Sequence, residues 1–201
     1  MTTFSSMLTS SQPELGAIER HLDGLPAPER LRQVLALGPS LQRSLWELAS
    51  AGKQLGPEYL VPADAPPLAL HPFEGRNSLP AFSRFAKVFY RQPDGGLAGY
   101  NRAWIAWLIG NGYFTCAPHP QKPEHELRID YTILPQHGLP EVGPVRSNDL
   151  FPSRFVYGGM RDDLRRVAAD VLIGRAFDRA GKAMDAWFVL CRWNQPTAAR
   201  T

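Results

Sequence analysis

Two apolar, strand-like segments near the C-terminus constrain the fold more than any other part of the sequence. They are Ala168 to Phe177 and Ala183 to Trp193. Between them lies Arg179-Ala180-Gly181-Lys182, in which Gly181 can adopt the positive φ that a tight hairpin turn needs. Successive residues of a strand point to opposite faces, and here both faces are largely apolar. We therefore expect an antiparallel hairpin that is covered on both sides, as in a barrel wall or a sheet with helices on its back.

The first third of the chain predicts helices. Residues 1–12 are polar and rich in Ser and Thr, which is typical of a flexible tail. In segment 13–55, Leu15, Ile18 and Leu22 follow helical spacing, and later leucines repeat the pattern. We expect two or three short amphipathic helices that pack on the sheet. A helical arm that binds a partner, in a scaffolding protein, is the alternative interpretation.

The rest of the chain predicts a β-rich core. Residues 56–80 contain six prolines and indicate an extended connector without regular structure. Residues 81–195 form the β-rich core, in which Trp104 to Ile109 fits either a helix or a buried strand. The expected strands before the C-terminal hairpin are residues 85–91, 97–102, 113–117 and 127–133. Together these patterns predict an α+β fold, with N-terminal helices packed on a strongly curved antiparallel sheet or incomplete barrel, in a single domain spanning 13–201.

Composition and motifs exclude several classes of protein. The net charge is only +3 and the basic residues are scattered, so we expect no nucleic-acid partner. No apolar run approaches the roughly 18 residues that span a bilayer, and the N-terminal segment has no secretory pattern, so we expect a cytoplasmic protein without a membrane partner. Cys116 and Cys191 lie in apolar runs and are interpreted as buried thiols, although a disulfide between neighbouring strands remains an alternative. The oligomeric state stays open.

No cofactor or metal site is expected from the motifs. The chain has no phosphate-binding loop, no dinucleotide-binding glycine motif and no serine-hydrolase motif. His119, His125 and His137 lie in proline-rich loops, and their spacing matches no zinc pattern. Asp162 and Asp163 open the segment RDDLRRVA, which we interpret as a helical turn whose dipole favours acidic residues.

Two sets of residues are candidates for a functional site. Aromatic side chains are more numerous in the β-rich part than a small sheet needs, which fits a lined apolar cavity, although core packing explains each one separately. Two mid-strand arginines could bind a ligand carboxylate, or could instead face solvent or an acidic neighbour. The candidate ligand-binding residues are Arg175, Arg192, Trp104, Trp107, Tyr113, Phe177 and Trp187. The candidate acid–base residues are Tyr131, Tyr157, Asp130 and His119.

The C-terminal hairpin resembles the small bacterial lipocalin-like proteins that are marked by a GxWxG motif. The resemblance is carried by Asp163 to Val167, by Val171 to Gly174, and by the aromatic strand Trp187 to Arg192; the GxWxG motif itself is absent from the chain. Gly174-Arg175 and Gly181-Lys182 are also weakly similar to the end of chorismate-lyase-like sheets. The lipocalin-like resemblance implies a curved antiparallel sheet, or incomplete lipocalin-like barrel, that holds a small apolar ligand.

These observations predict a cytoplasmic binding protein for a small hydrophobic, acidic molecule held in an aromatic-lined β cavity. The alternative is a cofactorless enzyme, such as a cyclase, isomerase or lyase, that uses one acid–base residue in the same pocket.

Overall fold

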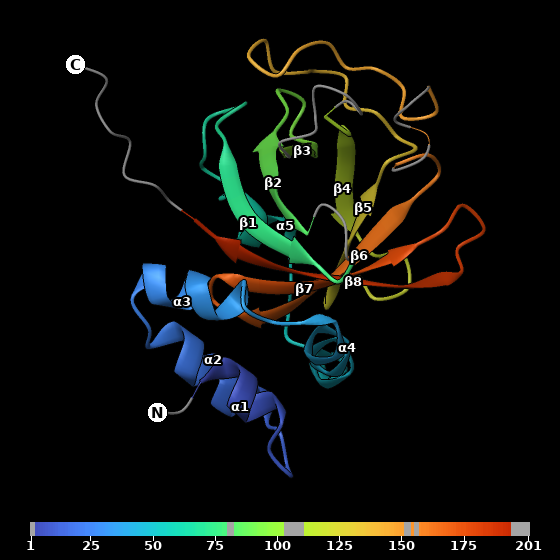
Figure 1. Cartoon of the computed structure of the whole chain (residues 1–201). Coiled ribbons are helices and arrows are strands. Elements are labelled where there is room, and N and C mark those ends of the chain that lie inside the picture. The colour runs from blue at the N-terminus through green and yellow to red at the C-terminus, as the bar shows by residue number, and fades with distance from the viewer. Residues whose placement is uncertain (1–2, 80–82, 103–110, 151–153, 155–156, 194–201) are drawn as a thin grey trace.

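The computed structural model describes residues 3–79, 83–102, 111–150, 154 and 157–193 of the 201-residue chain. In these residues, eight antiparallel strands follow one another around a closed barrel, and the five α-helices precede them in the chain. Figure 1 shows the barrel above and the N-terminal helices below it. The expected α+β class is therefore confirmed, and the barrel is closed rather than incomplete.

Each strand pairs with its neighbours in the sequence, and the first pairs with the last. This closure removes the open sheet edges that would otherwise pair with another chain. The strands are β1 (His71–Asn77), β2 (Arg84–Arg91), β3 (Leu97–Arg102), β4 (Phe114–Pro118), β5 (Glu126–Asp130), β6 (Arg161–Ala168), β7 (Val171–Phe177) and β8 (Ala183–Arg192).

Alternate residues of the strands fill the barrel with apolar side chains. The fully buried residues of this interior include Phe73, Phe89, Phe114, Leu127 and Leu172. Phe89 makes edge contacts with Phe73 and Phe114, at 5.6 Å between ring centroids in each pair. The interior is therefore a packed core in which aromatic rings from β1, β2 and β4 meet.

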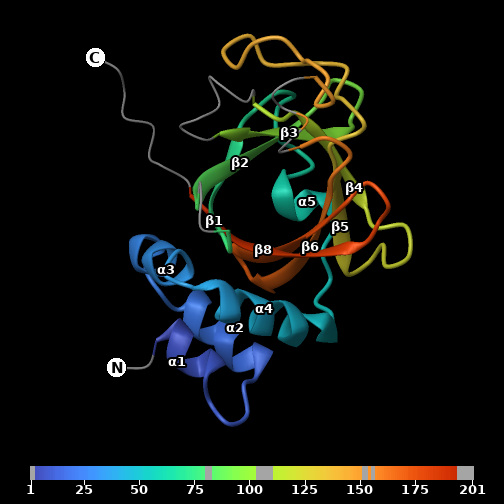
Figure 2. The ribbon, with the colours of Figure 1, turned by 45° about the vertical axis from the view of Figure 1, so that its right-hand side comes forward.

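One end of the barrel is closed by α5 (Pro57–Leu60), which lies within the ring of strands in Figure 2. Leu60 is fully buried among the interior residues. Arg91, the last residue of β2, donates to the carbonyl of Val61 at 2.9 Å, and Arg192, the last residue of β8, donates to the carbonyls of Tyr59 and Leu60. These bonds use carbonyl groups that a short helix leaves without intrahelical partners.

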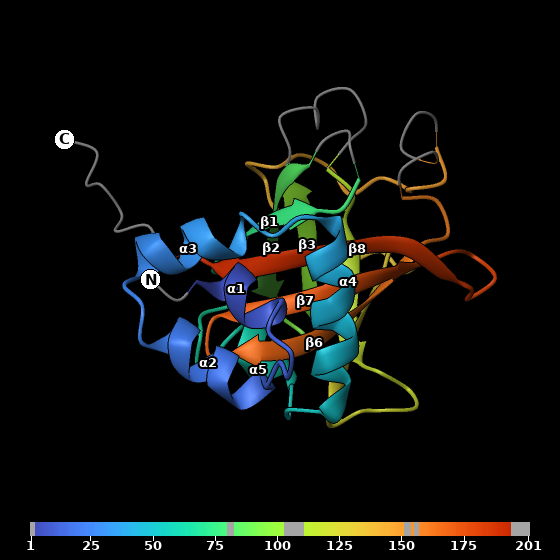
Figure 3. The ribbon, with the colours of Figure 1, turned by 60° about the horizontal axis from the view of Figure 1, so that its bottom comes forward.

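The other helices cover the outer face of β6, β7 and β8, as Figure 3 shows from below. They are α1 (Phe4–Leu8), α2 (Leu15–Asp23), α3 (Ala27–Val34) and α4 (Pro39–Leu48), followed by the 3-10 turn η1 (Ala49–Ala51). Their buried side chains pack against Val171, Ile173, Trp187 and Val189. This layer explains why both faces of the C-terminal hairpin are apolar: one faces the barrel interior and the other faces the helices.

Several elements differ from the expectations drawn from sequence. Residues 4–8, expected in a tail, form α1, and Phe4 is fully buried. The proline-rich span 56–80 contains α5 and β1. Proline suits the first turn of α5, where its missing N–H would have no partner in the helix. In β1, Pro72 is the second residue, and its carbonyl still accepts a bond from the N–H of Trp193.

The segment RDDLRRVA is a strand, not the helical turn that we interpreted it to be. It forms β6 between β5 and β7, with a register shift between Arg166 and Ala168. Asp162 and Asp163, which we placed together at a helix start, point to opposite faces of this strand, because side chains alternate along it. Asp162 lies inside the barrel and Asp163 lies outside.

Candidate functional site

A buried lysine lies inside the barrel, on the interior face of β2. Only 2% of Lys87 is exposed. Its Nζ donates to the Tyr131 hydroxyl at 2.5 Å and to Asn101 Oδ1 at 3.0 Å, and it lies 3.0 Å from Asp162 Oδ2. An ammonium group has three N–H donors, and these three acceptors match them. We call these four residues the interior polar cluster.

The other members of the interior polar cluster are also bonded to one another. The Tyr131 hydroxyl lies 3.2 Å from Asp162 Oδ2, to which it can donate. Asn101 Nδ2 donates to the Tyr131 hydroxyl at 3.0 Å and to the carbonyl of Gly112 at 3.3 Å. All three partners are at most 6% exposed. Buried polar groups are tolerated only when they are bonded in this way.

Aromatic rings surround the ammonium group of Lys87. Its nitrogen lies 5.0 to 5.6 Å from the ring centroids of Phe85, Phe114, Tyr131 and Phe188. Burial lowers the pKa of Lys87, and the nearby Asp162 acts in the opposite direction. Burial raises the pKa of Tyr131 well above its usual range, and the carboxylate of Asp162 adds to this effect. Tyr131 therefore keeps its proton at neutral pH and remains a hydrogen-bond donor.

The interior polar cluster lies toward the barrel end opposite α5. Asn101 is the second-last residue of β3 and Asp162 is the second residue of β6, whereas α5 is bonded to the last residues of β2 and β8. Near α5 the apolar side chains are joined by Arg91 and Arg192, which bond to α5, whereas the four residues of the interior polar cluster lie near the far end. Phe85 and Met160 at this end are only partly buried.

Two of the four candidate acid–base residues come together in the barrel. Tyr131 and Tyr157 stack, with 5.4 Å between ring centroids and 19° between ring planes. Asp130 and His119 lie on the outer face of the barrel instead. Asp130 accepts a bond from Arg161 at 2.9 Å, and His119 contacts Arg128.

The candidate ligand-binding residues do not gather at one place. Arg175 and Phe177 line a pocket on the outer face, and Trp187 packs beneath the helices. Arg192 lies inside the barrel, but its partners are Asp170 and the backbone of α5. Tyr113 lies on the outer face, where its hydroxyl donates to the carbonyl of Gly143 at 3.1 Å. Trp104 and Trp107 lie outside the described residues.

Lys87, Asn101 and Asp162 are not among the site residues expected from the sequence. One signal was available for Lys87: it alternates with Phe85 and Phe89 on the same strand face. A lysine between two phenylalanines on a predicted apolar face is costly unless it is paired, and marks a polar site inside the core. The register that brings Asp162 to this lysine depends on the barrel's closure, which no local pattern gives.

Comparison with family models finds no match to this chain, and no curated protein or solved structure matches it either. Within the part of the chain that the structure describes, every helix is too short or too polar to cross a membrane. The eight-stranded antiparallel barrel with a few helices fits a lipocalin-like fold. A closed barrel with a buried aromatic cluster also fits a small-molecule binding protein.

Proposed function

We propose that the chain binds a small, largely apolar molecule at the barrel end opposite α5, and that a carbonyl or hydroxyl group of this molecule bonds to the interior polar cluster. The observation that carries this proposal is Lys87, buried among four aromatic rings with three oxygen partners. Ligand sites combine an apolar lining with a few convergent polar groups, and this end of the barrel has both.

A comparison of the two ends of the barrel interior favours a functional role for the interior polar cluster over a purely structural one. The half near α5 is filled by residues such as Phe73, Leu172 and Leu190, which are fully buried. A buried ion pair adds little stability compared with apolar residues of the same volume. The ion pair between Lys87 and Asp162 is therefore not needed for packing, and groups with perturbed pKa values gather at functional sites.

The charges of the interior polar cluster favour an uncharged ligand. Lys87 and Asp162 contribute one basic and one acidic group, 3.0 Å apart. An additional carboxylate would bring a second negative charge beside Asp162 in a desolvated site, where such repulsion is strong. This revises the acidic ligand expected from the sequence: the ligand proposed for the interior is neutral.

Fluorine NMR with three ligands of matched shape tests this proposal. The probes are 4-fluoroacetophenone, 1-ethyl-4-fluorobenzene and 4-fluorobenzoate, which differ in carrying a ketone, no polar group or a carboxylate. We expect line broadening to be greatest for the ketone and least for the carboxylate. The variant Tyr131→Phe should weaken ketone binding about tenfold, the usual loss for one hydrogen bond to a charged network, and leave the hydrocarbon unaffected.

Tyr157→Phe is the matched control for Tyr131→Phe. Tyr157 stacks on Tyr131, but its hydroxyl makes no hydrogen bond to another described residue. This variant should bind the ketone as the unmodified protein does. The proposal fails if none of the three probes binds, if the carboxylate binds best, or if both tyrosine variants lose the ketone equally.

Acid–base catalysis at the same place is a second candidate function, because Tyr131 is a protonated donor 3.2 Å from the Asp162 carboxylate. With a ketone bound, the tyrosine hydroxyl could bond to the carbonyl oxygen while the carboxylate removes a proton from the adjacent carbon. The test is exchange of the methyl protons of 4-fluoroacetophenone in D2O, followed by NMR. Exchange above the buffer rate that is lost in Tyr131→Phe supports catalysis; exchange at the buffer rate supports binding alone.

A further inference from the structure

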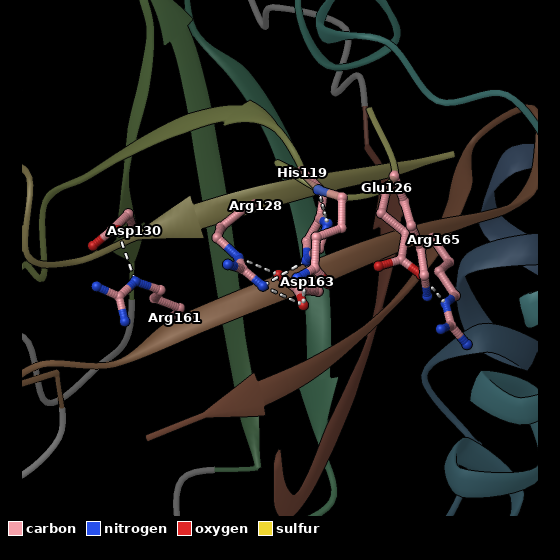
Figure 4. A network of polar contacts seen from close by, with 9 residues as sticks. His119, Glu126, Arg128, Asp130, Arg161, Asp163 and Arg165 are labelled. Atoms are coloured by element: carbon pink, nitrogen blue, oxygen red, sulfur yellow. Dashed lines mark hydrogen bonds and ion pairs between the residues drawn. The ribbon is translucent and has the colours of Figure 1, made fainter. Parts of the chain in front are cut away.

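Three ion pairs form a ladder across the outer face of β5 and β6, shown in Figure 4. In the antiparallel register, each charged residue of β5 lies opposite one of opposite charge on β6. The pairs are Glu126 with Arg165 at 2.9 Å, Arg128 with Asp163 at 2.7 Å and Asp130 with Arg161 at 2.9 Å. Opposite charges at directly facing strand positions stabilise a sheet, so the ladder has a structural role in itself.

A pocket of about 400 Å³ lies over this ladder, lined also by Trp46 of α4 and by Phe177. We call it the basic pocket, because its lining has three more basic than acidic side chains. The basic residues are Lys122, Arg128, Arg161, Arg165 and Arg175, and the acidic residues are Glu126 and Asp163.

Arg175 is the lining arginine without a carboxylate partner among the described residues. It lies opposite Asp163 in the register of β6 and β7, but Arg128 already binds both oxygens of that carboxylate, at 2.7 and 3.0 Å. The Nε of Arg175 donates to the carbonyl of Met184 at 3.1 Å, and its guanidinium lies 5.3 Å from the centre of the Trp187 ring. The two terminal nitrogens of this guanidinium therefore remain for another acceptor.

His119 already has partners in the wall of the basic pocket. Its Nδ1 accepts the N–H of Gln121 at 3.1 Å, and its Nε2 lies 3.4 Å from Asp163 Oδ2 and 2.6 Å from a terminal nitrogen of Arg128. With the proton on Nε2, the ring accepts from Gln121 and donates to Asp163, which Arg128 also binds. His119 therefore supports the arrangement of Arg128 and Asp163, and Arg175 is the group left for a ligand.

The same residues include a group that could in principle bind a metal ion. Ligand atoms of His119, Glu126 and Asp163 lie within 4.8 Å of one another. However, Arg128 contacts both His119 and Asp163, and Lys122 and Arg165 both bond to Glu126. A metal ion would have to displace three cationic side chains, so the charge favours an anion instead.

We propose that the basic pocket binds a small organic molecule with a multiply charged oxyanion group, either a phosphate monoester or a dicarboxylate. Arg175 supplies the donors, and its planar guanidinium group suits both oxyanions. Trp46 and Phe177 contact the organic part, since the pocket is larger than an inorganic phosphate needs. This site is on the opposite side of the barrel wall from the interior polar cluster and does not depend on it.

Isothermal titration calorimetry at low salt tests the proposal with phenyl phosphate, succinate, inorganic phosphate and uncharged phenol. We expect at least one of the two organic dianions to bind more tightly than phosphate, and phenol not to bind. The variant Arg175→Gln should weaken that binding about ten- to hundredfold, the usual effect of losing a charged hydrogen bond. Arg32→Gln removes the same charge from an exposed arginine on α3 and should have no effect.

The outcomes separate the alternatives. Preference for phenyl phosphate or for succinate identifies the type of oxyanion. The proposal is overturned if neither dianion binds, if Arg175→Gln and Arg32→Gln bind equally well, or if zinc binds and excludes phenyl phosphate. If Arg175→Gln does not fold, as judged by circular dichroism, Lys122→Gln replaces it, because the Lys122 side chain is 51% exposed and tolerates the change.

Discussion

The interior polar cluster and the outer ladder lie on opposite sides of the same barrel wall, and they differ in the balance of their acidic and basic groups. Asp162 and Asp163 are adjacent in β6, yet Asp162 bonds to a lysine in the core and Asp163 to an arginine beside a pocket. The interior polar cluster has one basic and one acidic group, whereas the pocket outside has an excess of basic groups. A desolvated site must balance its charges internally, while a partly hydrated one can keep an excess for a ligand.

The largest expected effect comes from breaking the interior ion pair. Lys87→Met leaves Asp162, which is 4% exposed, without a counter-charge. We expect the free energy of unfolding to fall by about 3–5 kcal/mol, the usual cost of an unpaired buried charge. The double variant Lys87→Met with Asp162→Leu should recover most of this loss. Urea unfolding measures both; a loss below about 1 kcal/mol in the single variant would show that water reaches Asp162.

Removing the basic partner of Asp163 on the outer face should lower the free energy of unfolding by less. Arg128→Gln removes the bidentate partner of Asp163, but the Arg128 side chain is 27% exposed and water can replace part of its contact. We expect a loss of about 2 kcal/mol, between the values for buried and exposed ion pairs. Arg161→Gln should lose less than about 1 kcal/mol, because its partner Asp130 is 15% exposed, whereas the Asp163 side chain is only 3% exposed. Equal losses for the two variants would mean that the stability contributed by each ion pair does not depend on how deeply its carboxylate is buried.

Removing a single tyrosine hydroxyl tests how much hydrogen bonding in the interior polar cluster contributes to stability. Tyr131→Phe removes an acceptor of Lys87 and of Asn101, and should destabilise the fold by about 1–2 kcal/mol. Tyr157→Phe should change stability by no more than about 0.5 kcal/mol. Thermal unfolding of the two variants at neutral pH provides the measurement. A larger loss for Tyr157→Phe would place an important hydrogen bond at a hydroxyl that has none among the described residues.

Some of these regions can be predicted from the sequence better than others. The α+β class and the C-terminal hairpin follow from local periodicity, because helix and strand repeats are properties of neighbouring residues. The outer ladder was also accessible: Glu126, Arg128 and Asp130 alternate in charge along β5, and β6 repeats the pattern with opposite sign. We interpreted β6 as a helical turn, which hid this complementarity.

The interior polar cluster was less accessible from sequence. It brings together residues from β2, β3 and β6 with one that directly follows β5, and only the closed barrel makes them neighbours. Their spacing along the chain carries no period, so no motif search finds them. Likewise, Arg175 shares a strand face with Ile173 and Phe177 as period two requires, but whether that face is inside or outside depends on the helices that cover it.

The smallest expected effect is a pH dependence confined to the outer ladder. Burial acts to raise the pKa of Glu126, but hydrogen bonds and attraction from Lys122 and Arg165 outweigh it and hold that pKa below its usual 4.5. A carboxyl group whose pKa is lower in the folded state stabilises the fold above its unfolded pKa, and this contribution is lost as the pH falls through the folded value. Glu126→Gln keeps an oxygen acceptor for Lys122 and Arg165 and loses only the charge. Although the Glu126 side chain is only 5% exposed, the variant should therefore be less stable than the unmodified protein at pH 7 by only about 1 kcal/mol, and this difference should shrink between pH 4.5 and pH 2. Urea unfolding across this range measures it, with Glu47→Gln on α4 as a control outside the ladder. A difference that stays constant down to pH 2 would show that Glu126 contributes through packing and hydrogen bonding rather than through its charge.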